Sequence, residues 1–314
     1  MNKKWMPRII AVGAFVVFIV LGACASSSDA VKTASSVDEV TGIKNKLAWL
    51  KKNAQSGGNY ILEVNKYEDI TFFLPGPLGN LGCGDLVYKD KKDITITIKG
   101  VEQQQTLRNA GEPGYIFKVG SGVTLILDEN IKLTGSIRKG SDIRETRAVV
   151  VVSSGGTLIM NDGSTITGGA HCGNGGGVYV DGGGTFLMKG GTITGNFCFL
   201  FNDYNSSLLE LQGGSYKGAG VYVDGKTTLF GKTSPGGTFT KTGGTIYGYT
   251  PDDPKSNKIT GLNGEGIIPN SGHAVFAGNT YKETNTVVKR KETTAGPDVN
   301  LHYSDDSFSG AWDY

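Results

Sequence analysis

The sequence has 314 residues, 49 of them glycine, and carries 31 basic against 29 acidic side chains. Three of the basic residues lie in the first eight positions, so the remainder has 28 basic against 29 acidic side chains and a formal charge of −1. This balance provides no basic stripe for a nucleic-acid partner, and the glycines are not spaced every third residue, which excludes a collagen-like chain.

Residues 1–23 are typical of a bacterial export signal. A basic start is followed by an apolar run at residues 9–20, which is shorter than the roughly 20 residues needed to span a bilayer. The run ends in Leu-Gly-Ala-Cys at 21–24, which resembles the lipobox of bacterial lipoproteins. The resemblance implies cleavage before Cys24 and acylation of that cysteine. The alternative is ordinary signal cleavage, with Cys24 as a bystander.

The anchor implied at Cys24 makes a membrane the first expected partner. Residues 24–36 are small and polar, so we expect a flexible tether. Ala25 and Ser26 stand where some inner-membrane lipoproteins carry Asp, so an outer-membrane location is favoured. Exposure at the cell surface is expected from the architecture rather than from a motif.

Residues 37–56 are predicted to form an amphipathic helix that caps the first coil of the folded body. Ser36 and Glu39 have the spacing of a capping box, and Gly57 stands where the helix should stop. Apolar residues recur on one face, at Val40, Ile43, Leu47 and Leu50.

An internal repeat determines the fold expected for residues 57–279. A short strand, a glycine or asparagine corner and a second strand recur at 122–136, 156–169, 184–196 and 237–248, and more loosely at 207–218. A third strand precedes these units, at 147–156, 175–184, 199–203 and 218–226, with a last copy at 272–279. Such short units leave no room for the helix of a βαβ unit. The pattern predicts an all-β, right-handed parallel β-helix, a solenoid of about seven coils.

Glycine corners indicate where one coil should end and the next begin. They recur at Gly190, Gly213 and Gly243, so each step between successive corners is expected to be one coil, the second step being lengthened by a loop. Residues 280–314 are polar and are expected to cap the far end.

The Gly-Gly-x-Val-Tyr-Val and Gly-Gly-Thr-Ile-Thr-Gly repeats resemble those of bacterial lipoproteins in the pectate-lyase-like superfamily of right-handed β-helices. This resemblance implies a fold more strongly than an activity, because the superfamily contains lyases, hydrolases and adhesins. Its lyases combine Ca²⁺-binding carboxylates with an Arg or Lys base, and its hydrolases use clustered Asp residues. We find no such set in this sequence, so no catalytic residue, metal site or cofactor is expected.

Asp181 and Asp224 occupy equivalent positions after Val-Tyr-Val and are candidate binding residues. The favoured alternative is an Asp-Gly turn in which each carboxylate binds its own backbone. The same holds for Asp128 and Asp162. The charged cluster of Asp142, Arg144, Glu145 and Arg147 is expected to be a solvated loop, and the three histidines, His171, His273 and His302, are not expected to be catalytic.

The tyrosines of the Val-Tyr-Val strands, Tyr179 and Tyr222, are expected to point outward, with Phe276 in the same place in the last copy. Leu200 or Phe201 is expected to lie between the two tyrosines. Such a ladder of exposed rings is a candidate surface for sugars, although stacking between coils without a ligand is the favoured interpretation.

Cys172 and Cys198 follow equivalent strands, so they are candidates for a disulfide, with free thiols as the alternative. Cys83 would stay unpaired.

These features predict a non-catalytic, monomeric envelope lipoprotein that presents a rigid β-helix to a glycan, a host surface protein or another envelope component. The alternative is a divergent polysaccharide lyase or glycoside hydrolase. It would require acidic groups of adjacent coils to converge around a cation, with Asp142, Glu145, Asp181 and Asp224 as the candidates.

Overall fold

The computed structural model describes residues 36–70, 84–110, 114–136, 147–171, 173–200, 218–225, 227–229, 232–250, 252–261, 274–278, 286–287, 300–303 and 308–309. Several predictions lie outside these residues: the export signal, the acylated Cys24 and nearly all of the tether. So do Cys83, Asp142, Arg144, Glu145, Cys172 and His273.

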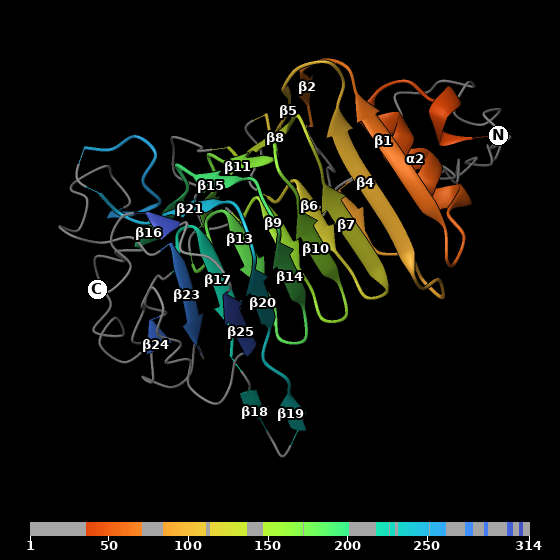
Figure 1. The fold of residues 1–314 in the computed structure, drawn as a ribbon. Coiled ribbons are helices and arrows are strands. Elements are labelled where there is room, and N and C mark those ends of the chain that lie inside the picture. Colours follow the sequence, from red (N-terminus) through yellow and green to blue (C-terminus); the bar gives the residue numbers. More distant parts are fainter. Residues whose placement is uncertain are drawn as a thin grey trace, which may run out of the picture.

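Most of the described chain forms parallel β-sheets (Figure 1). Sheet A contains β1 (Asn59–Val64), β4 (Ile94–Gly100), β7 (Val123–Leu127), β10 (Thr157–Met160), β14 (Thr185–Met188), β20 (Thr238–Lys241) and β25 (Asn300–Tyr303). Sheet B contains β2 (Glu68–Asp69), β5 (Gln105–Arg108), β8 (Ile131–Thr134), β11 (Thr165–Thr167), β15 (Thr192–Thr194), β21 (Thr245–Tyr247) and β26 (Phe308–Ser309). Sheet C contains β3 (Asp85–Leu86), β6 (Phe117–Val119), β9 (Val150–Val152), β13 (Val178–Val180), β17 (Val221–Asp224), β23 (Val275–Gly278) and β24 (Thr286–Val287).

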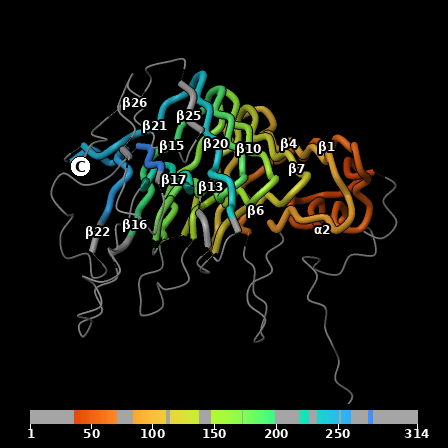
Figure 2. Tube along the Cα trace, turned by 90° about the horizontal axis from the view of Figure 1, so that it is seen from below, coloured from red at the N-terminus to blue at the C-terminus, as the bar shows by residue number. Residues whose placement is uncertain are grey.

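The chain visits sheets A, B and C in turn, and each strand pairs in parallel with the strand one circuit later. From the fourth circuit a small sheet D is inserted between B and C, made of β12 (Ala170–His171), β16 (Phe197–Leu200) and β22 (Lys258–Gly261). The circuits follow one another along one axis from the N-terminal helix to β26 (Figure 2). This solenoid-like stack of parallel sheets is consistent with a parallel β-helix.

Strand alternation explains why these segments form a core. In sheet A, Leu125, Leu158, Phe186 and Phe239 occupy one inward row in direct register, and all are fully buried. The rings of Phe186 and Phe239 lie 5.0 Å apart between centroids. Burial of each such side chain contributes about 1.5–3 kcal/mol, so the rows stabilise the stack while the intervening threonines face outward.

The coil lengths expected between β14 and β20 are wrong. β14 pairs directly with β20, with Phe186 opposite Phe239, so this circuit is much longer than the preceding one from Leu158 to Phe186. Because these two strands pair directly, Gly190 and Gly243 lie one circuit apart in sheet A and not two, while residues 207–217 lie outside the described chain. The physical reason is that glycines mark turns, whereas the pairing is fixed by side chains that stack in the core. The antiparallel hairpin of β18 (Thr227–Leu229) and β19 (Lys232–Ser234) lies within this circuit and projects away from the sheets (Figure 1).

The N-terminal helix is shorter than predicted. A 3₁₀ turn, η1 (Val37–Glu39), is followed by extended Val40 and then by α2 (Ile43–Asn53). The predicted capping box is absent because α2 begins after Gly42, which has φ of 79°, and the Ser36 side chain makes no capping hydrogen bond. Instead, the Glu68 carboxylate of β2 accepts a 3.0 Å hydrogen bond from the Ile43 N–H, which satisfies one of the unpaired donors at the helix start.

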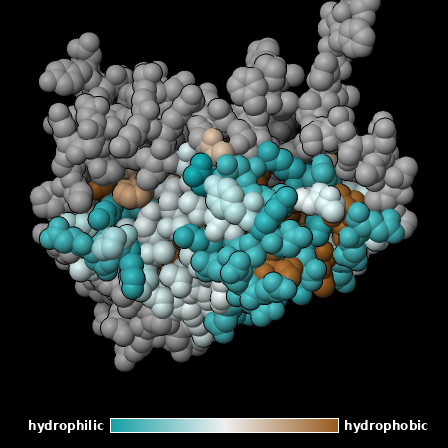
Figure 3. Space-filling model, turned by 90° about the horizontal axis from the view of Figure 1, so that it is seen from above, coloured by the Kyte–Doolittle hydropathy of each residue, from teal (hydrophilic) through white to brown (hydrophobic). Residues whose placement is uncertain are grey.

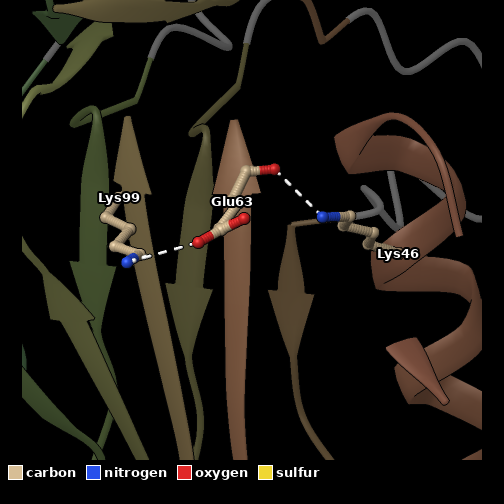
Figure 4. A network of polar contacts seen from close by, with 3 residues as sticks. All are labelled: Lys46, Glu63 and Lys99. Atoms are coloured by element: carbon tan, nitrogen blue, oxygen red, sulfur yellow. Dashed lines mark hydrogen bonds and ion pairs between the residues drawn. The ribbon is translucent and has the colours of Figure 1, made fainter. Parts of the chain in front are cut away.

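Helix α2 lies beside β1, the first strand of sheet A (Figure 1). Its Ile43, Leu47 and Leu50 belong to the same hydrophobic cluster as the inward residues of the sheets. The buried Lys46 donates a 3.0 Å hydrogen bond to the Glu63 carbonyl, and the Glu63 carboxylate pairs with Lys99 at 3.3 Å (Figure 4). The helix is thereby joined to β1 both through apolar packing and through a side-chain hydrogen bond to the strand backbone.

The sheets continue beyond residue 279, the predicted end of the last coil. Leu301 of β25 pairs with Phe239, and Phe308 of β26 pairs with Ile246. The described part of residues 280–314 therefore adds parallel strands to sheets A and B, and β24 pairs antiparallel with β23 at the edge of sheet C.

Candidate functional site on the outer face of sheet C

The outward row of sheet C collects polar and aromatic side chains. Strand register places Asp85, Lys118, Val151, Tyr179, Tyr222 and Phe276 next to one another across six strands. The flanking valines of β13, Val178 and Val180, are fully buried on the inner side, as alternation requires. The C-terminal half of the row is aromatic, and charged side chains lie in its N-terminal half.

The aromatic residues stack directly. Tyr179 and Tyr222 lie 5.3 Å apart between ring centroids with planes at 22°, and Tyr222 and Phe276 lie 5.9 Å apart with planes at 5°. Tyr179 pairs with Tyr222 in register, so the expectation that Leu200 or Phe201 would lie between them is wrong. Leu200 belongs to β16, which pairs with β22 in sheet D and is therefore not a strand of sheet C. Stacked pairs of this kind contribute about 0.5–1.5 kcal/mol beyond their burial.

The expected exposure of this ladder is also wrong for two of its members. Tyr222 and Phe276 are each 1% exposed, and Tyr179 alone is half-buried. The segment 173–177 lies against Tyr222: a Cβ atom placed on Gly175 would come 3.1 Å from the Tyr222 Cβ. Burial raises the pKa of the Tyr222 hydroxyl, and Asp224 and Tyr179 raise it further, while a hydrogen bond with the Asn174 side chain opposes them. This outcome favours a structural role for Tyr222 and Phe276.

His171 also lies on this face, a placement for which the sequence gives only one indication, its position shortly before a Val-Tyr-Val strand. Its ring lies edge-on to Tyr179, 6.2 Å between centroids at 81°, and its Nδ1 is hydrogen-bonded to the Asn174 carbonyl. Burial and, to a smaller extent, nearby Arg147 lower the pKa of His171 to about 4, against hydrogen bonds with the Asn174 and Gly175 backbone that raise it. The imidazole is therefore neutral near pH 7, with Nδ1 as the donor to Asn174.

Arg147 links the charged and aromatic halves of the row. Its exposed guanidinium lies close enough to both Tyr115 and His171 to lower the pKa of each. The Tyr115 hydroxyl donates a hydrogen bond to the Asp85 carboxylate, and burial with this bond raises the Tyr115 pKa. We call the residues Asp85, Tyr115, Arg147, His171 and Tyr179 the sheet C strip. Arg147 is exposed, and the other members of its predicted solvated cluster lie outside the described residues, so that prediction stays open.

Asp181 and Asp224 are brought together at the ends of β13 and β17. Asp181 accepts a 3.1 Å hydrogen bond from the Gly182 N–H, and Asp224 a 3.0 Å bond from the Gly225 N–H, which is the Asp-Gly turn arrangement. Burial and the negative charge of Asp181 raise the pKa of Asp224 to about 6, while the Gly225 N–H lowers it. Of the other corner residues, Asp128 accepts a 3.0 Å hydrogen bond from the Asn161 side chain.

Among the residues that the structure describes, no group of three or more His, Cys, Asp or Glu side chains is arranged to hold a metal ion. Cys198 is fully buried in β16, and the register of sheet D pairs it with His171. Because Cys172 lies outside the described residues, its disulfide with Cys198 stays a prediction.

Comparison with protein-family models, curated proteins and solved structures gives no match to this chain. Within the described ranges, no helix combines the length and the apolar character needed to cross a bilayer. The function is therefore inferred from the sheet C strip together with the sequence features at the N-terminus.

Proposed function

We propose that this protein is a non-catalytic envelope lipoprotein, anchored through Cys24, whose sheet C strip binds a glycan. The body is a right-handed parallel β-helix of about seven coils that resembles the pectate-lyase-like superfamily. Helix α2 caps its first coil, and part of residues 280–314 covers its far end. The proposal places the protein in the outer membrane as a monomer, with the β-helix exposed at the cell surface.

The observation that carries the proposal is the contact of His171 with Tyr179, together with Arg147, which lies near enough to His171 to lower its pKa. A half-buried aromatic ring offers a flat apolar face for a sugar ring. An exposed guanidinium close to His171 binds carboxylate or sulfate groups through paired N–H donors. A neutral imidazole supplies a hydrogen-bonding group for hydroxyls. These groups come from three separate segments, and the stacked coils hold them on one face.

The buried part of the aromatic ladder supports a rigid site. Tyr222 and Phe276 do not reach solvent, but they hold Tyr179 from one side by continuous stacking. His171 holds it from another side. A ring that is already fixed loses little conformational freedom when a ligand binds, so less of the binding free energy is lost to ordering.

Binding of the purified protein to a panel of neutral and acidic oligosaccharides tests this function. We expect Tyr179→Ala to weaken binding at least about tenfold through lost stacking, and Arg147→Gln to weaken binding of acidic glycans selectively. Tyr247→Ala is the matched control, because Tyr247 is a half-buried outward tyrosine of sheet B. A host protein or envelope component as ligand would be indicated if no glycan bound. Equal losses in Tyr179→Ala and Tyr247→Ala would contradict the assignment of the strip.

A divergent polysaccharide lyase or hydrolase is the second candidate, favoured by one observation. Burial and the neighbouring charge of Asp181 raise the pKa of Asp224 to about 6, so two carboxylates of different pKa lie close together. Both Asp residues also serve their own turns, which explains them without a reaction. Incubation with uronate and neutral polysaccharides, followed by assays for unsaturated products and reducing ends, tests this candidate. Activity that is lost in Asp181→Asn and Asp224→Asn would replace the non-catalytic proposal.

A further inference from the structure

A basic surface forms where the C-terminal end of α2 meets residues 87–93. Lys51 donates a 3.3 Å hydrogen bond to the Val87 carbonyl, and the Lys92 N–H donates a 3.1 Å bond to the Ser56 hydroxyl. The Gly57 N–H adds a 2.9 Å bond to the Lys92 carbonyl. These bonds bring two lysine-rich segments that are distant in sequence onto one surface.

This surface is more positive than the rest of the molecule. Residues 51–52 and 87–93 contain five lysines and two aspartates, a formal charge of +3, whereas the chain after residue 23 has a charge of −1. Lys52, Lys89 and Lys92 are exposed. Lys51 and Lys91 point their ammonium groups at backbone carbonyls, and burial lowers the Lys51 pKa against the opposing charge of Asp85. Lys51 is exposed as well, but its ammonium group already serves backbone carbonyls, so Lys52, Lys89 and Lys92 are the lysines assigned to a partner.

An apolar side chain lies within this basic surface. Val87 is 50% exposed, between Lys51 and Lys89. The large hydrophobic residues that are exposed in the described chain, Ile61, Tyr67 and Val87, all belong to the first circuit. Elsewhere, the face seen from above is largely hydrophilic over the described N-terminal part, with isolated hydrophobic patches (Figure 3). We call Lys52, Val87, Lys89 and Lys92 the basic end patch.

The position of the tether indicates which partner the basic end patch would bind. The tether from Cys24 to Val37, where the described structure begins to fold, is short. A chain of that length reaches about 45 Å when fully extended and averages about 20 Å when flexible. An anchor at Cys24 would therefore keep the N-terminal end of the solenoid, rather than β26 at its other end, next to the bilayer. This step rests on the proposed lipid anchor.

We propose that the basic end patch docks on anionic phospholipid headgroups of the membrane that holds the anchor. Lys52, Lys89 and Lys92 pair with phosphate groups, each adding attraction at an anionic surface. Val87 enters the boundary between headgroups and acyl chains, as apolar residues of peripheral membrane proteins do. Docking fixes the orientation of the solenoid, so that its N-terminal end faces the membrane and the later strands of sheet C extend away from it.

Vesicle co-sedimentation tests this proposal without the anchor. The protein would carry Cys24→Ser and lack residues 1–23, which removes no described element because the first one begins at Val37. With phosphatidylglycerol–phosphatidylcholine vesicles, we expect binding that falls steeply with salt, and with phosphatidylcholine alone we expect none. The triple variant Lys52→Glu, Lys89→Glu, Lys92→Glu should bind at least about tenfold more weakly.

A matched triple variant, Lys132→Glu, Lys189→Glu, Lys255→Glu, makes the same charge change on other parts of the solenoid. It should bind nearly as well as the parent protein. Val87→Asp should weaken binding without altering the unfolding temperature, since Val87 is half exposed. Failure of the parent protein to bind anionic vesicles, or an equal loss in both triple variants, would overturn the proposal. Palmitate labelling at Cys24 tests the lipid anchor separately. A failure of the anchor proposal can therefore be distinguished from a failure of the docking proposal.

Discussion

The side-chain oxygen of Asn257 accepts two hydrogen bonds from Asn196, one from its backbone N–H and one from its amide, both at 2.9 Å. Asn196 in turn accepts a 2.9 Å bond from the Gly169 N–H one circuit earlier. Both asparagines are fully buried. The two amides therefore form a ladder that satisfies backbone groups at the corner where sheet B leads into sheet D, across three successive circuits.

Replacing Asn196 by Ala is expected to lower the free energy of unfolding by about 2–4 kcal/mol. The substitution leaves the buried Gly169 N–H without its acceptor, which costs about 1–3 kcal/mol. It also removes the amide hydrogen bond to the Asn257 oxygen, worth about 0.5–1.5 kcal/mol, whereas the bond from the backbone N–H of residue 196 to that oxygen remains. Urea titration followed by circular dichroism measures the change. Asn45→Ala, at a partly exposed side chain bonded to the Thr41 carbonyl, is the control and should cost less than about 1 kcal/mol. Equal losses of unfolding free energy in the two variants would contradict a stabilising role for the asparagine ladder.

The equivalence of the Val-Tyr-Val strands was predictable from sequence because they repeat the same inward and outward chemistry, whereas their direct pairing was not, since the strand at 199–203 was expected between them. Val178 pairs with Val221, and Val221 with Val275. The pairing of Phe186 with Phe239 was not predictable, since the long segment between them contains glycine corners that resemble the end of a coil. A glycine pair indicates a local backbone turn. Which strands are neighbours depends instead on the match between their buried side chains.

The sheet C strip was largely invisible in the sequence. Arg147 and His171 come from separate segments of the repeat, and nothing in their spacing indicates that Arg147 approaches His171 or that His171 contacts Tyr179. One sequence feature could have indicated that His171 belongs to the strip: it lies just before a Val-Tyr-Val strand. The burial of Tyr222 was missed because alternation predicts the side of a sheet on which a residue lies, but not what packs on that side. The start of α2 depends on Glu68, a residue distant in sequence that local capping rules do not include.

Tyr222→Ala is expected to destabilise the protein by about 3–5 kcal/mol, because a buried ring in contact with Tyr179 and Phe276 is removed. Tyr222→Phe keeps both stacked contacts and loses the hydrogen bond with Asn174, so its cost should be about 0.5–1.5 kcal/mol. Thermal and urea unfolding of the two variants measure these values. A loss in Tyr222→Phe as large as in Tyr222→Ala would show that the ring stack contributes little.

Asp224 should make the protein less stable as the pH rises through weakly acidic values. Burial and the charge of Asp181 raise its folded pKa to about 6 from an ordinary 3.8, so the folded state binds more protons between these values. The free energy of unfolding therefore falls as pH rises from about 4 to about 6, by about 1–2 kcal/mol after allowance for partial exposure. Asp224→Asn keeps the oxygen that binds the Gly225 N–H and should remove this slope. Asp181→Asn should reduce it, and an unchanged slope in Asp224→Asn would be contrary to expectation.

His171 should act in the opposite direction, as a source of acid sensitivity. Its folded pKa of about 4 lies below the ordinary 6.5, because burial disfavours the cation and Arg147 repels it. The folded state then binds fewer protons than the unfolded state between these values, so stability falls as pH is lowered from about 6.5 to about 4. His171→Gln, which retains a donor for the Asn174 carbonyl, should lessen that loss by about 2 kcal/mol. Proton NMR of the three histidines, assigned with this variant, measures the pKa directly. A His171 midpoint near 6.5 would place the ring in solvent and remove it from the sheet C strip.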